Sequence, residues 1–433
     1  MTDVADLLSY LAAAPSPYHA VAEARRRLAD AGFVALDPTG PWPDAPGGYL
    51  VAVGGALVAW RVPEGAPPSR RMRIVGAHTD SPNLRIKPSP DTGAHGWQQL
   101  AVEVYGGALW NSWLDRDLGL SGRVVVRTAD GTVEERLFAC DCPLLRIPQL
   151  AIHLDRDVNG KGLQLNAQQH LTPVWGTGPV EPGAFVAHLA DEVAVAPDAV
   201  VAWDAMVHET TPPARIGRRH ELVASGRLDN LVSCWAGVEA LIGAAPHDAA
   251  PDDAPDGAPV AVLCLYDHEE VGSTSATGAD GALLASVLER AVLARGGTRE
   301  DLLRALAGSV CASADMAHAT HPNYPERHEP GHHVAIDGGP VIKVNANQRY
   351  ATDAASTATL VDACERAGVP HQAFVSRNDS PCGSTIGPVT AARLGVATVD
   401  VGVAMLSMHS ARELCGAEDP PRLAAALGAF LGS

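Results

Sequence analysis

One histidine and one aspartate follow a short apolar segment of this sequence. His78 and Asp80 come directly after the segment 73–77. Catalytic groups of α/β proteins gather at the ends of such strands. An imidazole can bind a metal ion while a neighbouring carboxylate fixes its tautomer. The pair therefore indicates part of a metal site, and a hydrogen-bonded turn is the alternative interpretation.

Two adjacent glutamates, Glu269 and Glu270, follow the apolar segment 260–266. Ionised carboxylates at the end of a buried strand are unfavourable unless a cation compensates them. Neighbouring side chains on an extended segment point to different sides. One glutamate can therefore bind a metal while the other reaches a water molecule as general base.

Three further residues extend this set. Asp229 stands near the start of a predicted helix, where an aspartate ordinarily caps the helix, and the competing role is a carboxylate shared by two metals. Asp315 and His409 each follow a short apolar segment, and each alone is more often structural. Together, imidazoles and carboxylates suit two divalent ions such as zinc, which can activate a water molecule and polarise a carbonyl group.

Two common catalytic motifs are absent from the sequence. It contains no G-x-S-x-G and no G-x-x-x-x-G-K-[ST]. These absences argue against the common serine hydrolases and a P-loop enzyme.

Length, charge and cysteine usage limit the class of protein. With 433 residues the chain is expected to form two domains. Its net charge of −18 argues against nucleic acid and anionic membranes as partners. No signal peptide or membrane span is evident, so we expect a soluble, cytoplasmic protein whose eight cysteines are reduced.

The elements that must position these residues change in kind along the chain. Strand and helix signals alternate at first, become strand-rich from about residue 87 to 219, and alternate again after residue 221. We therefore predict an α/β domain of residues 1–87 and 220–433, interrupted by a β-rich domain of residues 88–219. The Pro- and Asp-rich segment 244–259 is predicted to be a surface loop. Expected strands include 49–53, 56–61, 71–77, 102–105, 122–127, 132–139, 184–195, 260–266, 309–312 and 396–401, and expected helices 229–242, 283–293 and 421–431.

Longer strings carry a family resemblance. They run in order from residue 75 to 413 and include VGAHTDSPNLRIK (75–87), SGRLDNL (225–231), YDHEEVGS (266–273), SADMAHATHPNY (313–324), GPVIKVNANQRYA (339–351) and MHSARE (408–413). This pattern resembles the aspartyl aminopeptidase family of dinuclear zinc peptidases. The resemblance implies a phosphorylase/hydrolase-like α/β catalytic domain, split in sequence by a β-rich dimerisation domain, and dimers that assemble into a tetrahedral dodecamer.

The resemblance also implies a role for each candidate ligand. Asp229 would bridge two divalent metals, most simply zinc, with cobalt or manganese as substitutes. One metal would be completed by His78 and Asp315 and the other by Glu270 and His409. Glu269 would be the general base.

Further roles follow from the same resemblance. Asp80 would orient His78. The substrate would be a peptide with an unblocked N-terminal Asp or Glu, and Lys343 would face its acidic side chain. Tyr350 would contribute to the pocket, with core packing as the alternative. Apart from the resemblance, His318 lies close to Asp315 in sequence and is a candidate contact to the substrate or to the residues around the ligands. His153 would enter the site of a neighbouring subunit, with an interface histidine as the alternative.

Two other functions stay open at this point. One is a related dinuclear aminopeptidase with neutral or broad preference, and Lys343 and His153 favour the acidic preference instead. The other is a self-assembling shell or cargo protein with a vestigial zinc site, against which the intact Glu269 argues. The sequence does not distinguish Asp from Glu as the preferred residue, because one methylene contributes little to discrimination.

Overall fold

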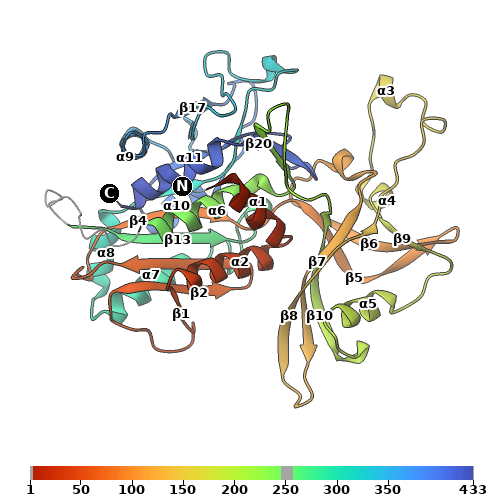
Figure 1. Cartoon of the computed structure of the whole chain (residues 1–433), viewed down its shortest axis with the longest axis horizontal. Helices are drawn as coiled ribbons and strands as arrows, with labels where there is room; N and C mark the ends of the chain where they lie inside the picture. Colours follow the sequence, from red (N-terminus) through yellow and green to blue (C-terminus); the bar gives the residue numbers. More distant parts are fainter. Residues whose placement is uncertain (1–2, 245–256, 433) are drawn as a thin grey trace.

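The computed structural model describes residues 3–244 and 257–432 and shows a larger and a smaller lobe (Figure 1). We call residues 83–209 the inserted lobe, because the chain enters it from one strand of the larger lobe and then returns to that lobe. Most of the segment 244–259, predicted to be a loop, lies outside the described residues. No helix of the described parts is long and apolar enough to cross a membrane.

The larger lobe is built on a mixed sheet. Within the described residues this sheet has nine strands. The neighbouring strands β13, β4, β14 and β18 at its centre run parallel, so their carboxyl ends meet at one edge. In spatial order the strands are β1 (Val34–Ala35), β2 (Gly47–Val53), β3 (Ala56–Val62), β13 (Val260–Tyr266), β4 (Met72–His78), β14 (Val310–Ala314), β18 (Ala397–Gly402), β16 (Val341–Val344) and β17 (Gln372–Val375).

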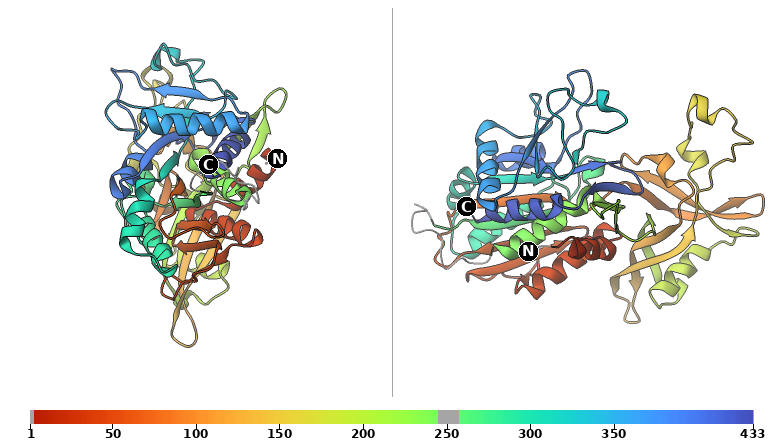
Figure 2. Two further views of the ribbon diagram at one scale, coloured as in Figure 1. Left: turned by 90° about the vertical axis from the view of Figure 1, so that its left-hand side faces the viewer. Right: turned by 45° about the horizontal axis from the view of Figure 1, so that its top comes forward.

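Helices cover both faces of this sheet (Figures 1 and 2). The strand β13, with sequence VAVLCLY, is buried along its whole length, as a strand between two helical layers must be. One face packs against α1 (Val4–Ala13), α2 (Pro17–Asp30), α6 (Leu228–Gly243), α9 (Ala354–Ala367) and α11 (Asp419–Leu431). The other face packs against α7 (Leu283–Ala294), α8 (Arg299–Ala307) and α10 (Ile386–Leu394). This architecture confirms the predicted α/β class.

The inserted lobe contains an antiparallel sheet of six strands among the described residues. The order is β8 (Val133–Leu145), β7 (Leu118–Arg127), β10 (Val200–Glu209), β5 (Asn83–Ala94), β6 (Trp97–Tyr105) and β9 (Val174–Thr177). Short helical segments accompany it, namely η1 (Trp110–Trp113), α3 (Val158–Lys161), α4 (Ala167–His170), α5 (Ala184–Glu192) and η2 (Pro197–Ala199). One of these contradicts the sequence analysis.

The predicted strand 184–195 is wrong, because residues Ala184–Glu192 form the helix α5. Phe185 and Leu189 are four residues apart, lie on one helical face and are both fully buried in the core of the inserted lobe. Apolar spacing of this kind fits a helix, and packing against the sheet stabilises the helix despite its short length.

A small third sheet joins distant parts of the larger lobe. Its order is β11 (Ala214–Ile216), β12 (Leu222–Ser225), β20 (Glu413–Gly416), β19 (Ala404–Leu406) and β15 (Ala317–His318). Ser225 pairs with Glu413 across β12 and β20. The sheet therefore brings the start of α6 close to the segment that contains His409.

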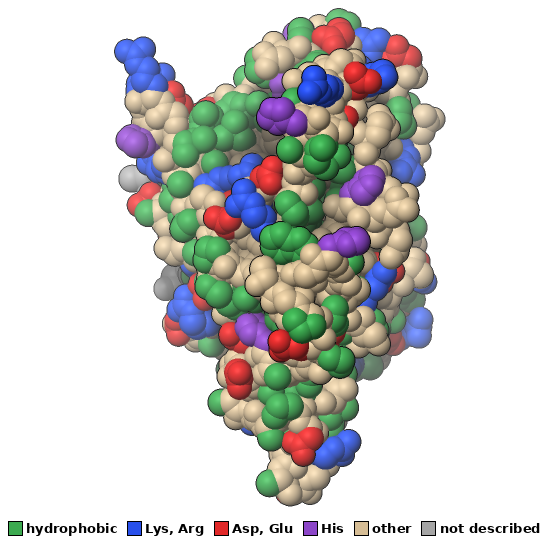
Figure 3. Space-filling view, turned by 90° about the vertical axis from the view of Figure 1, so that its right-hand side faces the viewer, with side chains coloured by type: hydrophobic (Ala, Val, Ile, Leu, Met, Phe, Trp, Pro, Cys, Tyr) green, Lys and Arg blue, Asp and Glu red, His purple; other side chains and the backbone are tan. Residues whose placement is uncertain are grey.

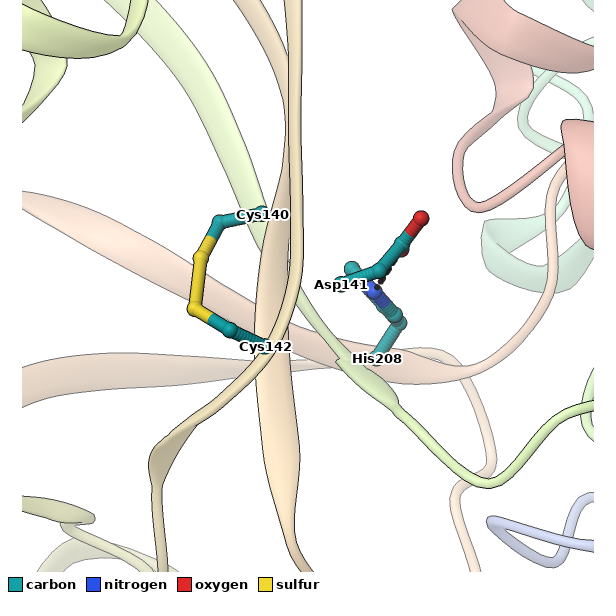
Figure 4. The surroundings of a disulfide bond; sticks show 4 residues. All are labelled: Cys140, Asp141, Cys142 and His208. Atoms are coloured by element: carbon teal, nitrogen blue, oxygen red, sulfur yellow. Dashed lines mark hydrogen bonds and ion pairs between the residues drawn. A yellow bond between two sulfur atoms is a disulfide. The ribbon is translucent and has the colours of Figure 1, made fainter.

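The strand β8 holds a disulfide that the sequence analysis did not predict. Cys140 and Cys142 are bonded, with Cα atoms 5.4 Å apart, so the expectation that all eight cysteines are reduced is wrong (Figure 4). Residues two apart on a strand point to the same side, which places both sulfur atoms together. The side chain of Asp141 lies on the other side, where its Oδ1 is 2.9 Å from His208 Nε2.

Candidate metal centre

Three neighbouring strands bring four of the candidate residues to one edge of the central sheet. His78 is the last residue of β4, and it pairs in register with Tyr266 at the end of β13. The short helix η3 (Glu269–Val271) follows β13 and carries both glutamates, and Asp315 follows β14 directly. Because these strands are parallel, side chains that follow them meet at the same edge.

Two further segments complete the cluster. Asp229 is the second residue of α6, and its side chain is buried at the start of that helix. His409 lies in the turn between β19 and β20. The structure therefore brings together all five residues expected to bind metal, although they come from positions 78 to 409 of the sequence.

The two imidazoles face opposite oxygens of one carboxylate. His78 Nε2 lies 3.4 Å from Asp229 Oδ1 and 3.5 Å from Asp315 Oδ1. His409 Nε2 lies 3.5 Å from Asp229 Oδ2 and 3.4 Å from Glu270 Oε2. Asp229 thus stands between two groups of ligands, which is the arrangement of a carboxylate that two cations share.

The cluster has donor atoms of the types that bind divalent cations, and some of its oxygens have no hydrogen-bond partner among the described residues. Ligand atoms of His78, Asp229 and Glu270 lie within 4.8 Å of one another. Asp229 Oδ1 and Glu270 Oε1 are buried oxygens without a hydrogen-bond partner among the described residues. Buried carboxylates of this kind are costly unless they are paired or bind metal. Imidazole and carboxylate donors without a thiolate suit zinc.

Crowding among these carboxylates shifts their protonation. Burial raises the pKa of Glu269 to about 7; His78 opposes this shift, whereas Asp315 and Asp229 add to it. Burial and then Asp229 raise the pKa of Glu270 well above its ordinary value. The pKa of His409 rises to about 9, since Asp229 outweighs the effect of burial. A site with so many close carboxylates favours the binding of protons or cations.

Asp80 lies directly behind the cluster and is fully buried. Its Oδ1 accepts the backbone N–H of Glu269 and its Oδ2 that of Glu270, each at 3.1 Å. His78 Nδ1 lies 3.0 Å from the carbonyl oxygen of Asp80 and 3.4 Å from its Oδ1. The two acceptors of Asp80 hold a proton on Nδ1, which leaves Nε2 free to bind a metal.

Glu413 is a further residue of the site that the sequence analysis missed. Its Oε2 accepts the backbone N–H of Asp229 at 3.0 Å and its Oε1 that of His409 at 2.7 Å. Burial and then Asp229 raise the pKa of this carboxyl to about 8, although the two N–H donors act in the opposite direction. Its position four residues after His409, within MHSARE, was the one signal available.

The cluster forms the wall of a cavity of about 440 Å³. Lys343, Tyr350 and His318 also line this cavity. Lys343 is 2% exposed, and its Nζ donates to Asp315 Oδ2 at 3.2 Å and to the carbonyl oxygen of Met316 at 3.0 Å. The ring centroid of Tyr350 lies 5.2 Å from the same Nζ. A buried cation therefore stands in the wall beside one of the candidate ligands.

His153 lies elsewhere, on the exposed loop between β8 and α3 in the inserted lobe (Figure 1). It does not line the cavity of its own chain. The neighbouring side chains of Leu150, Ile152 and Leu154 are 58%, 47% and 75% exposed. Figure 3 looks onto this lobe and shows apolar groups among the charged side chains of its outer face.

Comparison with known proteins gives a family match over most of the chain. Residues 10–431 match the family described as aminopeptidase I zinc metalloprotease (M18). A protein of Streptomyces coelicolor, "Probable M18 family aminopeptidase 2", is 58% identical over 427 residues, which are 98% of this chain and 96% of that protein.

Solved structures agree with the sequence comparison. The chain resembles one from "Cryo-EM structure of the Ape4 and Nbr1 complex", with a TM-score of 0.94 and 37% identity over 99% of this chain and 85% of the other. It also resembles a chain from "Structure of S. cerevesiae mApe1 dodecamer", with a TM-score of 0.85 and 26% identity over 99% and 95%.

Proposed function

The chain belongs to the M18 family of zinc metalloproteases, and on that premise we propose that this aminopeptidase removes Asp and Glu from the unblocked N-termini of peptides. The buried cation of Lys343 in the wall of the metal-lined cavity is the observation that carries the acidic preference. An acidic side chain that enters this cavity meets carboxylates on one side and Lys343 on the other.

The metal ligands divide into two groups around Asp229. We assign His78 and Asp315 to one zinc ion, Glu270 and His409 to the other, and Asp229 to both, because its two oxygens face the two imidazoles. When bound, the two ions would polarise the scissile carbonyl group and activate a water molecule.

Glu269 is the proposed general base. Its Oε2 lies 4.0 Å from His78 Nε2, on the cavity side of the ligands. Burial raises the pKa of this carboxyl to about 7, which suits a group that takes a proton from the attacking water and returns it to the leaving amine near neutral pH. The backbone N–H of Glu269 is fixed by Asp80, so the position of the base depends on that aspartate.

Lys343 has one N–H left for a substrate. An ammonium group has three donors, and Asp315 and the Met316 carbonyl occupy two of them. The third can reach the carboxylate of an acidic side chain, with Tyr350 and His318 as neighbouring walls of the pocket. Charge-assisted hydrogen bonds of this type are about twice as strong as neutral ones.

Assembly is part of the proposal. The structure of one relative, S. cerevisiae mApe1, is described as a dodecamer. We propose that this chain also forms a homo-oligomer in which His153 enters the cavity of a neighbouring subunit. The exposure of His153 and of the three apolar residues around it supports this role.

Chromogenic aminoacyl substrates test the proposed preference. We expect the zinc-loaded protein to cleave aspartyl and glutamyl substrates, to lose this activity with a chelator, and to cleave alanyl or leucyl substrates far more slowly. In Lys343→Met, kcat/KM for acidic substrates should fall much more than that for neutral ones. Zinc content must be measured for each sample, because Lys343 also contacts Asp315. Equal loss on both substrate types would contradict the role of Lys343, and a zinc-loaded protein that cleaves none of them would contradict the proposed function.

A further inference from the structure

The inserted lobe contributes a hydroxyl group to the metal centre. Tyr105 is the last residue of β6, and its hydroxyl donates to Asp80 Oδ2 at 2.7 Å. This is a contact between lobes: Asp80 follows β4 of the larger lobe, whereas β6 belongs to the sheet of the inserted lobe. Tyr105 is not among the residues that line the cavity, and within the described residues its hydroxyl has no hydrogen bond to a candidate metal ligand.

The carboxylate of Asp80 also contacts three residues of the site. Tyr105 shares Oδ2 with the backbone N–H of Glu270, while Oδ1 faces the backbone N–H of Glu269 and the imidazole of His78. Without the hydroxyl, Oδ2 keeps the backbone N–H of Glu270, and the carboxylate is held by one donor fewer. A small shift of this carboxylate would move the acceptors that face both glutamates and His78.

The ring of Tyr105 is held in place independently of its hydroxyl. Tyr105 pairs with Asn83 between β6 and β5. The guanidinium carbon of Arg85 lies 4.1 Å from the ring centroid, which is a cation–π contact. Removal of the hydroxyl alone should therefore leave the ring and the strand where they are.

The residues after Tyr105 contact the other side of the site. Gly107 accepts a hydrogen bond from His409 Nδ1 through its carbonyl oxygen, at 3.1 Å. Gly106 has a φ of +69°, and a Cβ atom there would lie 3.1 Å from the Cβ of Glu270. The two residues that follow β6 thus approach the cluster at His409 and at Glu270.

We propose that Tyr105 is a positioning residue of the catalytic centre: its hydroxyl fixes the Asp80 carboxylate, which in turn holds the general base and orients His78. The inference rests on the proposed function of Glu269 and His78. It also makes the orientation of the inserted lobe a condition for full activity, because the hydroxyl reaches Asp80 only while β6 stays against the larger lobe.

Tyr105→Phe tests the proposal, with Tyr49→Phe as a matched control. Tyr49 is a buried tyrosine of β2 whose hydroxyl donates to the Ala45 carbonyl oxygen at 2.9 Å, away from the cavity. We expect Tyr105→Phe to lower kcat about tenfold, as is typical for outer contacts of a metal site, with KM changed less than twofold. Zinc affinity, measured by competition with a chromophoric chelator, should fall several-fold, while the control changes neither quantity.

A double variant with Asp80→Asn separates positioning from general destabilisation. If the hydroxyl acts through Asp80, its removal should have little further effect on zinc affinity once Asp80 is replaced. Two results would overturn the proposal. The first is a Tyr105→Phe variant whose kcat and zinc affinity lie within twofold of those of the control. The second is a loss of zinc affinity from Tyr105→Phe that is as large in the Asp80→Asn background as in the wild-type background. Zinc affinity needs no substrate, and kcat can be read on whichever aminoacyl substrate the wild type cleaves. An experiment that contradicts the acidic preference can therefore be told apart from one that contradicts the positioning role of Tyr105.

Discussion

Glu413 accepts the backbone N–H of His409 at 2.7 Å with a carboxylate that is 2% exposed. Its other oxygen holds the backbone N–H of Asp229. One buried side chain thus fixes the main chain at two candidate ligands whose side chains lie 3.5 Å apart. Glu413, which does not line the cavity, thus fixes the position of these two candidate ligands relative to each other.

Replacement of Glu413 should therefore weaken metal binding without touching the cavity wall. In Glu413→Gln the backbone N–H of either Asp229 or His409 loses its acceptor and faces the NH2 group of the glutamine. A buried donor without an acceptor costs about 1–3 kcal/mol. We expect zinc affinity to fall roughly tenfold and the apo protein to unfold at a lower temperature. Glu300→Gln, an exposed glutamate of α8, is the control. Zinc affinity equal to that of the control would contradict this role.

Replacement of Glu269 by Gln should abolish turnover and leave the metal in place. The change keeps the shape of the side chain but removes the group that accepts the proton, and general bases contribute about 10²–10⁴-fold to rate. We expect kcat to fall by at least about 100-fold, with zinc content and melting temperature close to those of the wild type. Elemental analysis and steady-state kinetics measure both. Residual activity above a tenth of the wild type would refute the assignment.

Asp229→Ala should lose both metals and activity. The side chain stands between the two groups of ligands, so its removal affects each of them. Bound metal stabilises only the folded state. We therefore expect zinc to raise the melting temperature of the wild type but not that of the variant. An equal zinc-dependent rise in both proteins would show that Asp229 is not a ligand.

The stability of the protein should fall on acidification through His19, a residue that does not line the cavity. Burial lowers the pKa of His19 to about 4, and the nearby His208 adds to the shift. In the unfolded chain a histidine takes up a proton near pH 6.5, so between pH 6.5 and 4 the unfolded state binds more protons and the free energy of unfolding decreases. At pH 5 this residue accounts for a loss of about 2 kcal/mol relative to pH 8.

A substitution isolates this contribution. Urea unfolding of the wild type and of His19→Gln at pH 8 and pH 5 should show a smaller decrease in the variant, by about 1–2 kcal/mol. The comparison of the two decreases removes the effect of other titrating groups and of the lost hydrogen bond to Ser16. Parallel decreases in both proteins would contradict the depressed pKa of His19.

The sequence predicted the residues at strand ends better than it predicted their surroundings. Apolar runs such as 260–266 require a strand buried on both faces, and the polar residues that follow such runs must meet at one edge. For that reason His78, Glu269, Glu270 and Asp315 could be grouped before the structure was known. Asp229 and His409 were added to this set because their residue types suit a metal site, although a structural role explains each of them more simply in isolation.

The groups behind the ligands could not be predicted in this way. Tyr105 and Glu413 act through hydrogen bonds to residues that are distant in sequence, and neither stands after a distinctive apolar run. The helix α5 was predicted as a strand because its apolar segment is short, and the helical spacing of Phe185 and Leu189 was not recognised in it. The Cys140–Cys142 bond depends on the path of β8, which composition does not specify. Each of these features is decided by contacts between lobes or strands rather than by local pattern.

The order of the ligands along the chain has a consequence for synthesis of the protein. His78 and His409 share contacts with one carboxylate, yet 331 positions separate them (409 − 78 from their numbers). A nascent chain that stops before His409 carries four of the five proposed ligands and the proposed general base, but it lacks the residue that would complete the second group. Contacts of such high sequence separation form slowly, because they require the closure of a long loop. A ribosome-bound chain should therefore be inert toward peptides, and hydrolysis should begin only after the last ligand has emerged and β20 has joined the sheet.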